Sequence, residues 1–164
     1  MLKIRKATPE DLPAITEIYN DAILQTVATF DTEPKTIEER KTWFKNHDSK
    51  HPLLVAEQDG LIVGWASLSK WSDRRGYADT AEVSLYVEKT HRQAGFGKKL
   101  LKSIVQAGQE AGLHTVIAQI VEGNEPSINL FRREGFAEVG VLKEVGWKFG
   151  KVLDVHVMQK IYST

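Results

Sequence analysis

Two glycines, Gly95 and Gly97, stand one residue apart between a strand-like run and a helix-like run of the sequence. Residues 81–87 alternate as a β-strand does, and from Leu100 onward apolar residues recur at helical spacing. A turn without side chains at such a junction aims several backbone N–H groups at one point, which also carries the positive end of the helix dipole. The junction predicts a strand–turn–helix unit with an anion site suited to a phosphate.

Two familiar phosphate loops do not fit this junction. The P-loop needs Gly-Lys followed by Ser or Thr, whereas Gly97-Lys98 is followed by Lys99. The dinucleotide loop needs a third glycine at position 100, where Leu100 stands. The pattern therefore disfavours a nucleoside triphosphate and NAD, and a tight connection without any ligand remains the alternative for a lone G-x-G.

The rest of the chain predicts an α/β fold, with a mixed β-sheet flanked by helices on both faces. Helices are expected after the caps at Thr8 and Thr36, over residues 97–111 and from Asn124. The first of these could begin as late as Asp11. Strands are expected near residues 2–5, in a hairpin over 52–71, and over 81–87, 115–121, 137–145 and 153–161, with Gly146 and Gly150 between the last two.

Composition limits the classes of function. The 164 residues fit one domain, 1–164, and 22 basic against 22 acidic residues leave no overall charge to draw the chain to nucleic acid or a membrane. Without cysteine there is no thiolate metal site and no acyl-cysteine intermediate, and the five histidines lack metal-ligand spacing, so no metal is expected. With no signal peptide or membrane-length apolar run, a cytoplasmic protein is expected.

The motif Arg92-x-x-Gly95-x-Gly97 after this strand resembles the pyrophosphate-binding motif of the GCN5-related N-acetyltransferase (GNAT) superfamily. Asn124-x-x-Ser127-x-x-x-Phe131 is similar to its second CoA-contacting motif, and KIRKATPEDLPAITEIYN to its N-terminal part. Within the superfamily the chain looks most like phosphinothricin and methionine sulfoximine acetyltransferases. Four segments carry that closer likeness: IYNDAI, the arginine of RRGYADTAE, E-x-S-x-Y-V and GWKFGKVLDV.

The resemblance implies a GNAT fold and acetyl-CoA as co-substrate. The residues expected to hold the cofactor are Leu85, Tyr86 and Val87 of the strand, Gln93, Ala94, Gly95, Phe96, Gly97 and Lys98 of the loop, and Asn124 and Ser127. Glu82 is the expected general base, because Val83, Leu85 and Val87 lie on the opposite face of its strand. From the pattern alone, a glutamate facing water is the alternative.

The substrate is expected to be a small zwitterionic amino acid or analogue rather than a polyamine. Arg74 and Arg75 lie in a short loop before the strand, where they could meet a carboxylate in bidentate fashion. The resemblance assigns that role to Arg74. Phe30 and Trp71 are expected to wall the pocket, with polar contacts from Thr80. Family likeness also implies a homodimer.

Three positions depart from the family pattern. Phe131 stands where many members have a tyrosine that protonates the leaving thiolate, so the general acid is unassigned; solvent or Tyr86 are the alternatives. Phe149 and Val152 stand where relatives commonly have histidine and tryptophan, which puts strict phosphinothricin specificity in question. Two other functions therefore remain open: CoA binding without catalysis, and acetylation of a different amine, on a peptide or polyamine.

Overall fold

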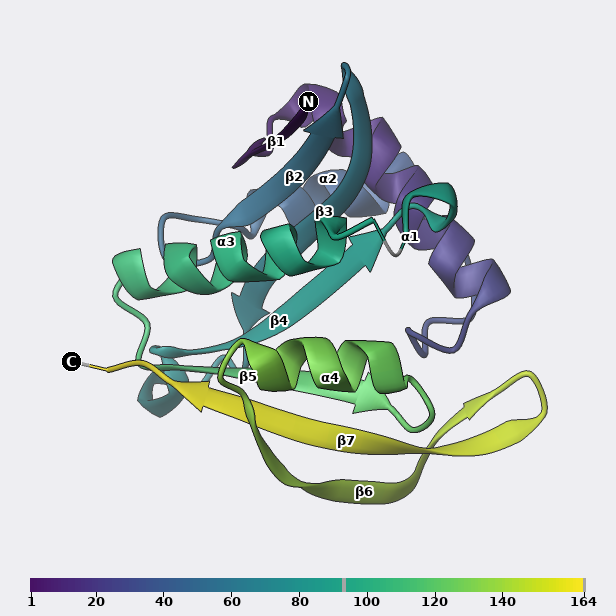
Figure 1. Cartoon of the computed structure of the whole chain (residues 1–164), viewed down its shortest axis with the longest axis vertical. Helices are drawn as coiled ribbons and strands as arrows, with labels where there is room; N and C mark the ends of the chain where they lie inside the picture. Colours follow the sequence, from purple (N-terminus) through teal and green to yellow (C-terminus); the bar gives the residue numbers. More distant parts are fainter. Residues whose placement is uncertain (93, 164) are drawn as a thin grey trace.

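The strands of the chain form one mixed sheet in the order β1-β2-β3-β4-β5-β7-β6 (Figure 1). The computed structural model describes residues 1–92 and 94–163. The strands are β1 (Leu2–Lys6), β2 (Leu53–Gln58), β3 (Leu61–Lys70), β4 (Thr80–Val87), β5 (Thr115–Val121), β6 (Ala137–Lys148) and β7 (Lys151–Ile161). Neighbouring strands are antiparallel except β4 and β5, which run parallel. The predicted mixed sheet is confirmed.

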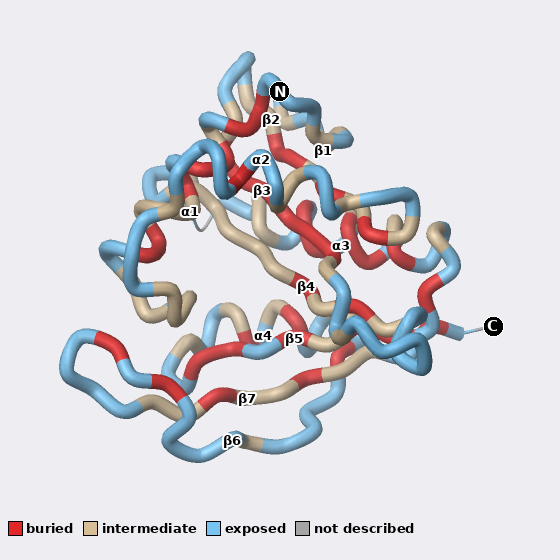
Figure 2. The backbone as a smooth tube through the Cα atoms, turned by 180° about the vertical axis from the view of Figure 1, so that it is seen from behind, coloured by how far each residue is buried: buried red, intermediate tan, exposed pale blue. Residues whose placement is uncertain are grey.

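Helices cover both faces of this sheet, also as predicted (Figure 1). The α-helices are α1 (Leu12–Gln25), α2 (Ile37–Lys45), α3 (Phe96–Glu110) and α4 (Glu125–Arg133). On one face α3 and α4 bury a large core that includes Leu100, Leu101 and Phe131; on the other, Ile15 and Ile18 of α1 pack on β2 and β3. Figure 2 shows the buried residues running through the central strands and along α3. Among the described residues, no helix is long and apolar enough to span a membrane.

Local signals place most element boundaries correctly. The Thr36–Glu39 capping box is present, with both hydrogen bonds at 3.1 Å, and it begins α2. The β2–β3 hairpin turns at Asp59 and Gly60, whose φ angles of +51° and +86° are those of a type I′ turn. Thr8 caps only a 3-10 turn, Pro9–Asp11, and α1 follows at Leu12, so the later predicted start is correct.

The C-terminal hairpin is longer than the sequence predicts. Gly146 lies inside β6 rather than between two strands, and the chain reverses at Phe149 and Gly150, where both φ angles are positive. A glycine at position 146 predicts a break between two strands, and this prediction is wrong. A bulge between Leu142 and Gly146, with Glu144 at φ +55°, instead lets β6 bend and continue. This β6–β7 arm, residues 144–153, extends beyond the rest of the sheet (Figure 1).

One glycine of α3 is required by close packing. A Cβ at Gly108 would lie 2.5 Å from the Tyr162 hydroxyl and 2.8 Å from a Leu68 methyl group. We therefore expect Gly108→Ala to lower the free energy of unfolding by roughly 1–2 kcal/mol, because overpacking outweighs the better helix propensity of alanine. Urea unfolding checks this, and an unchanged or raised midpoint would show that the contact relaxes at no cost.

Candidate active site

A cleft opens where β4 and β5 separate. The two strands pair at Thr80, Ala81 and Glu82 of β4, and within the described residues their register ends at the pair Glu82–Ile117. The edge of β4 that faces β5 beyond this point, through Leu85, Tyr86 and Val87, therefore presents backbone groups without a partner strand. Leu85, Tyr86 and Val87 are the strand residues expected to hold the cofactor.

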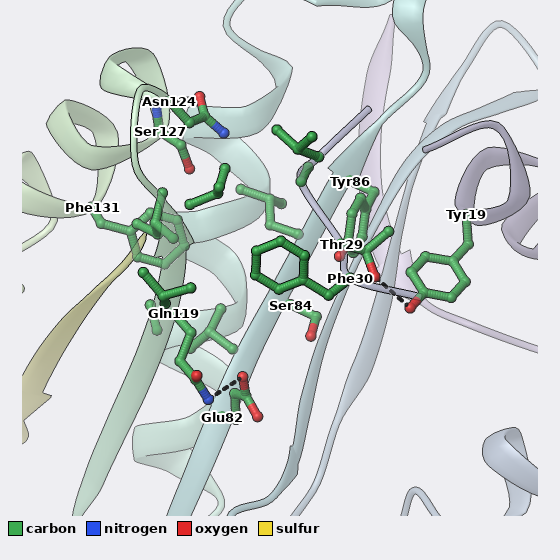
Figure 3. A pocket seen from close by; sticks show the side chains of 18 residues that line it. Tyr19, Thr29, Phe30, Glu82, Ser84, Tyr86, Gln119, Asn124, Ser127 and Phe131 are labelled. Carbon is green, nitrogen blue, oxygen red and sulfur yellow. Dashed lines mark hydrogen bonds between the residues drawn. The ribbon is translucent and has the colours of Figure 1, made fainter. Parts of the chain in front are cut away.

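A pocket of about 300 Å³ occupies this cleft. Its walls come from β4, from β5, from the start of α4 and from the loop after α1 (Figure 3). Among the described residues that line it, Glu82 alone carries a charge. A positively charged or proton-releasing group that enters this pocket therefore meets a single carboxylate.

Glu82 points into the pocket, as does Gln119 from β5 (Figure 3). The Nε2 of Gln119 donates a hydrogen bond to Oε2 of Glu82 at 3.1 Å. Burial raises the pKa of Glu82, and the hydrogen bond from Gln119 partly offsets that effect. A half-buried carboxylate with a raised pKa is suited to accept a proton, whereas the alternative of an outward-facing strand glutamate does not match this position.

Aromatic residues form the opposite wall. Tyr86 packs against Trp65 and Tyr19, with ring centroids 5.0 Å and 5.2 Å away. The Tyr19 hydroxyl bonds the Thr29 hydroxyl at 3.0 Å (Figure 3). It also donates a hydrogen bond to the Asp31 carboxylate. Burial raises the pKa of Tyr86 to about 12, while the Thr29 hydroxyl acts in the opposite direction. The Tyr86 hydroxyl is therefore protonated at neutral pH.

Phe131 of α4 also lines the pocket, where it packs edge-on against Phe136 with centroids 5.0 Å apart. Its side chain is buried and has no proton to donate. A tyrosine acid at this position is thus absent, as the sequence indicates, and Tyr86 is a hydroxyl-bearing side chain in the same pocket.

The strand–turn–helix junction has the predicted form. Gly95, with φ +84°, precedes α3 as its N-cap, and α3 begins at Phe96. The first intrahelical hydrogen bond runs from Lys99 N to Gly95 O, so the N–H groups of Phe96, Gly97 and Lys98 point out of the helix end. Ala94 lies exposed in the same turn, whereas Gln93, also expected to contact the cofactor, is outside the described residues. The geometry is that of an anion-binding helix N-terminus.

Asn124 and Ser127, predicted to contact the cofactor, both line the pocket from the start of α4 (Figure 3). Asn124 is also the N-cap of α4, and its Oδ1 accepts a hydrogen bond from Ser127 N at 3.4 Å. The side-chain amide of Asn124 keeps its Nδ2 donor for another partner.

Of the predicted acceptor residues, Phe30 alone lines the pocket. Arg74 and Arg75 are exposed in the loop before β4, where Arg74 precedes and Arg75 begins a 3-10 turn, Arg75–Tyr77. Trp71 directly follows β3, and Thr80 precedes Glu82 by two residues on the same strand face. The structure therefore brings Glu82, Phe30, Asn124 and Ser127 together and leaves the arginine loop, Trp71 and Thr80 outside the pocket lining.

Sequence reasoning missed Gln119 and Thr29 as pocket residues. Gln119 is the polar residue inside the apolar run TVIAQIV, a signal that could have marked it. Thr29 lies in a loop without periodicity, where no pattern predicts its direction. The described residues contain no group of three or more histidine, cysteine, aspartate or glutamate side chains that could hold a metal ion.

Comparison with known protein families identifies the family of this chain. The model of the acetyltransferase (GNAT) domain family matches residues 4–157 of the chain. The chain belongs to the GNAT acetyltransferase family. The match spans β4, the α3 junction and α4, so the resemblance seen in the sequence is confirmed, and this GNAT protein is an N-acetyltransferase.

Similar GNAT proteins cover nearly the whole chain. The L-methionine sulfoximine/L-methionine sulfone acetyltransferase of Pseudomonas aeruginosa is 39% identical over 158 residues, which are 95% of this chain and 92% of the relative. The ribosomal-protein-alanine N-acetyltransferase structure from Brucella melitensis has 42% identity and a TM-score of 0.94, covering 98% of this chain and 99% of that one. The GNAT superfamily phosphinothricin acetyltransferase of Sinorhizobium meliloti, solved in complex with acetyl-CoA, has 33% identity and a TM-score of 0.94, covering 98% and 88%. The GNAT fold is thus confirmed.

Proposed function

We propose that this GNAT enzyme, acting as a single domain over residues 1–164, transfers the acetyl group of acetyl-CoA to the α-amino group of small amino-acid analogues. Phosphinothricin, methionine sulfoximine and methionine sulfone are the expected acceptors. The observation that carries the proposal is Glu82, a half-buried carboxylate with a raised pKa in a pocket that opens on the free edge of β4. The named activities of the Pseudomonas and Sinorhizobium relatives support the same class of acceptor.

The acetyl donor would lie along the cleft between β4 and β5, from the start of α3 to the start of α4. The pyrophosphate of acetyl-CoA would meet the N–H groups at the start of α3, and Arg92, held by its hydrogen bond to Val87 O at 3.1 Å, supplies nearby positive charge. The rest of the cofactor would follow the edge of β4 toward Asn124 and Ser127. The Sinorhizobium structure, which contains acetyl-CoA, supports this cofactor.

Transfer proceeds by direct attack, since the chain has no cysteine to carry an acyl group. Glu82 accepts the proton of the acceptor amine, and the amine nitrogen bonds to the thioester carbonyl carbon. Backbone N–H groups at the free edge of β4 stabilise the oxyanion that forms on the carbonyl oxygen. The C–S bond then breaks, and the CoA thiolate takes a proton from Tyr86 or from solvent.

The loop before β4 would bind the carboxylate of the acceptor. The pocket lining contributes no cation among the described residues, so an anionic group must be held at the rim. Arg74 is the arginine that the family resemblance assigns to this role, with Arg75, Trp71 and Thr80 nearby in the chain. Phe30 supplies the apolar contact inside the pocket.

A free-thiol assay with a panel of acceptors tests the proposal. Purified enzyme and acetyl-CoA are combined with methionine sulfoximine, methionine sulfone, phosphinothricin, spermidine or an alanine-initiated peptide. The proposal expects thiol release with the three amino-acid analogues. CoA binding without thiol release from any of them would favour a CoA-binding protein without catalysis.

Peptide amines are the second candidate acceptor. The Brucella structure, at 42% identity, carries the name ribosomal-protein-alanine N-acetyltransferase. The lone carboxylate in the pocket suits any α-amine equally, so charge at Glu82 does not separate the two classes. If kcat/KM for the alanine-initiated peptide is higher than kcat/KM for methionine sulfone, peptide amines are the preferred acceptors.

The expected homodimer would use the β6–β7 arm. Its outward face exposes four large apolar residues, Val145, Trp147, Phe149 and Val152, between 49% and 64% accessible. Exposed apolar surface on one extended element favours an association site. Sedimentation of the wild type against the double variant Trp147→Lys/Phe149→Lys tests this, with a shift from dimer to monomer expected.

A further inference from the structure

The buried face of the β6–β7 arm contacts the loop after α1, and that loop lines the pocket. Residues 145–149 of β6 alternate, with Val145, Trp147 and Phe149 exposed and Gly146 and Lys148 buried. The buried residues meet the loop after α1, which carries Thr29 and Phe30 into the pocket. The bulge that continues β6 past Leu142 determines which residues face this loop.

The Phe30 ring packs directly against Gly146. A Cβ at Gly146 would lie 2.2 to 2.5 Å from three carbon atoms of that ring, well inside van der Waals contact. No side chain other than hydrogen fits there while Phe30 keeps its place. Because Phe30 lines the pocket near Glu82 and Ser84 (Figure 3), its ring position sets how much room an acceptor has.

Lys148 fixes the backbone next to that ring. Lys148 as a residue is only 3% accessible, and its Nζ donates to Thr29 O at 2.7 Å. Burial lowers the pKa of Lys148, while Asp31 in the same loop acts in the opposite direction. A buried ammonium is costly to the fold, and such a cost is commonly found where a functional element has to be held in place.

We infer that Gly146 and Lys148 are positioning residues that hold Phe30 against the acceptor space, so that the β6–β7 arm controls which acceptors the pocket admits. The inference rests on the proposed function, in which Phe30 contacts the acceptor. Thr29 also bonds Tyr19, so the same loop joins α1 to the arm. The acetyl-CoA side of the cleft, at Asn124 and the start of α3, is not part of these contacts.

A double-mutant cycle between Gly146→Ala and Phe30→Ala tests the contact. Gly146→Ala alone should lower acceptor kcat/KM by roughly 10- to 100-fold, since a displaced wall misplaces the amine, with the acetyl-CoA Kd changed less than about twofold. In the Phe30→Ala background the same change should have an effect below about twofold, because the clashing ring is gone. Gly140→Ala on the same strand, where a Cβ meets nothing within 4 Å, is the matched control and should resemble the wild type.

The inference would be overturned if Gly146→Ala lowers kcat/KM equally in the wild-type and Phe30→Ala backgrounds. It would also be overturned if the acetyl-CoA Kd rises as much as kcat/KM falls, since either result indicates a purely structural role. If Gly146→Ala does not fold, Lys148→Met takes its place, with the exposed strand lysine variant Lys3→Met as control. Hydrogen exchange of residues 26–31 should accelerate in Lys148→Met and not in Lys3→Met. Hydrogen exchange can be measured even if the wild type acetylates none of the acceptors, and that lack of activity would refute the proposed function alone. Unchanged exchange in Lys148→Met would refute the positioning role.

Discussion

Replacing Glu82 with glutamine is expected to lower turnover by about 10²–10⁴-fold, the usual contribution of a general base. The amide keeps the size and the hydrogen-bonding position beside Gln119 but cannot accept the amine proton. Acetyl-CoA affinity should stay unchanged, because the start of α3 and the start of α4 are untouched. The measurement is kcat with saturating acceptor beside the acetyl-CoA Kd.

The pH dependence of turnover tests the role of Glu82 independently. Burial raises the pKa of Glu82 above its ordinary value, and only the deprotonated carboxylate accepts a proton. Wild-type turnover should therefore fall as the pH is lowered through that raised pKa, and Glu82→Gln should lack this acidic limb. Glu110→Gln, on the exposed end of α3, is the control with an unaltered profile. Near-normal turnover of Glu82→Gln across pH would remove Glu82 from the mechanism.

Replacing Gly97 with aspartate is expected to weaken acetyl-CoA binding by roughly 10²-fold, since a like charge facing the pyrophosphate costs several kcal/mol. The added Cβ fits, because at Gly97 it would meet Leu130 and Val87 at 3.7 Å and 3.8 Å, which are ordinary contact distances. A carboxylate in the first turn of α3 also interacts favourably with the helix dipole. Stability should therefore be kept or increased while affinity falls.

Gly97→Ala is the matched control, because it adds the Cβ without the charge. Titration calorimetry with acetyl-CoA and thermal unfolding separate the two effects. If Gly97→Asp and Gly97→Ala bind acetyl-CoA equally well, the start of α3 does not hold the pyrophosphate.

Local chemistry explains how much of this fold could be predicted from the sequence. The hairpin predicted over 52–71 turns at Asp59-Gly60, and the helix predicted after Thr36 begins with a capping box to Glu39; both depend on residues within one turn of each other, and both elements appear as predicted. The G-x-G junction is also local, which is why Gly95 could be placed at the start of α3 from its pattern. At Gly146 the same local reasoning was wrong, because that glycine makes room for a distant phenylalanine.

Pocket residues were harder to predict, because they meet across long separations. Gln119 reaches Glu82 from 37 residues away, and Lys148 reaches Thr29 from 119 residues away. Neither contact follows from periodicity, which says which face of a strand is buried but not what lies opposite. The divergence of β4 and β5 after Glu82, which creates the pocket, depends likewise on the packing of the whole sheet.

The most direct test of the proposed reaction is a single-turnover experiment with methionine sulfone and acetyl-CoA, analysed by mass spectrometry of the small molecules and of the protein. The account predicts one N-acetylated methionine sulfone for each free CoA thiol, with no acetyl group left on the chain. Thiol release without N-acetylated product, or an acetyl group retained on the protein, would contradict direct transfer to the α-amine in the Glu82 pocket.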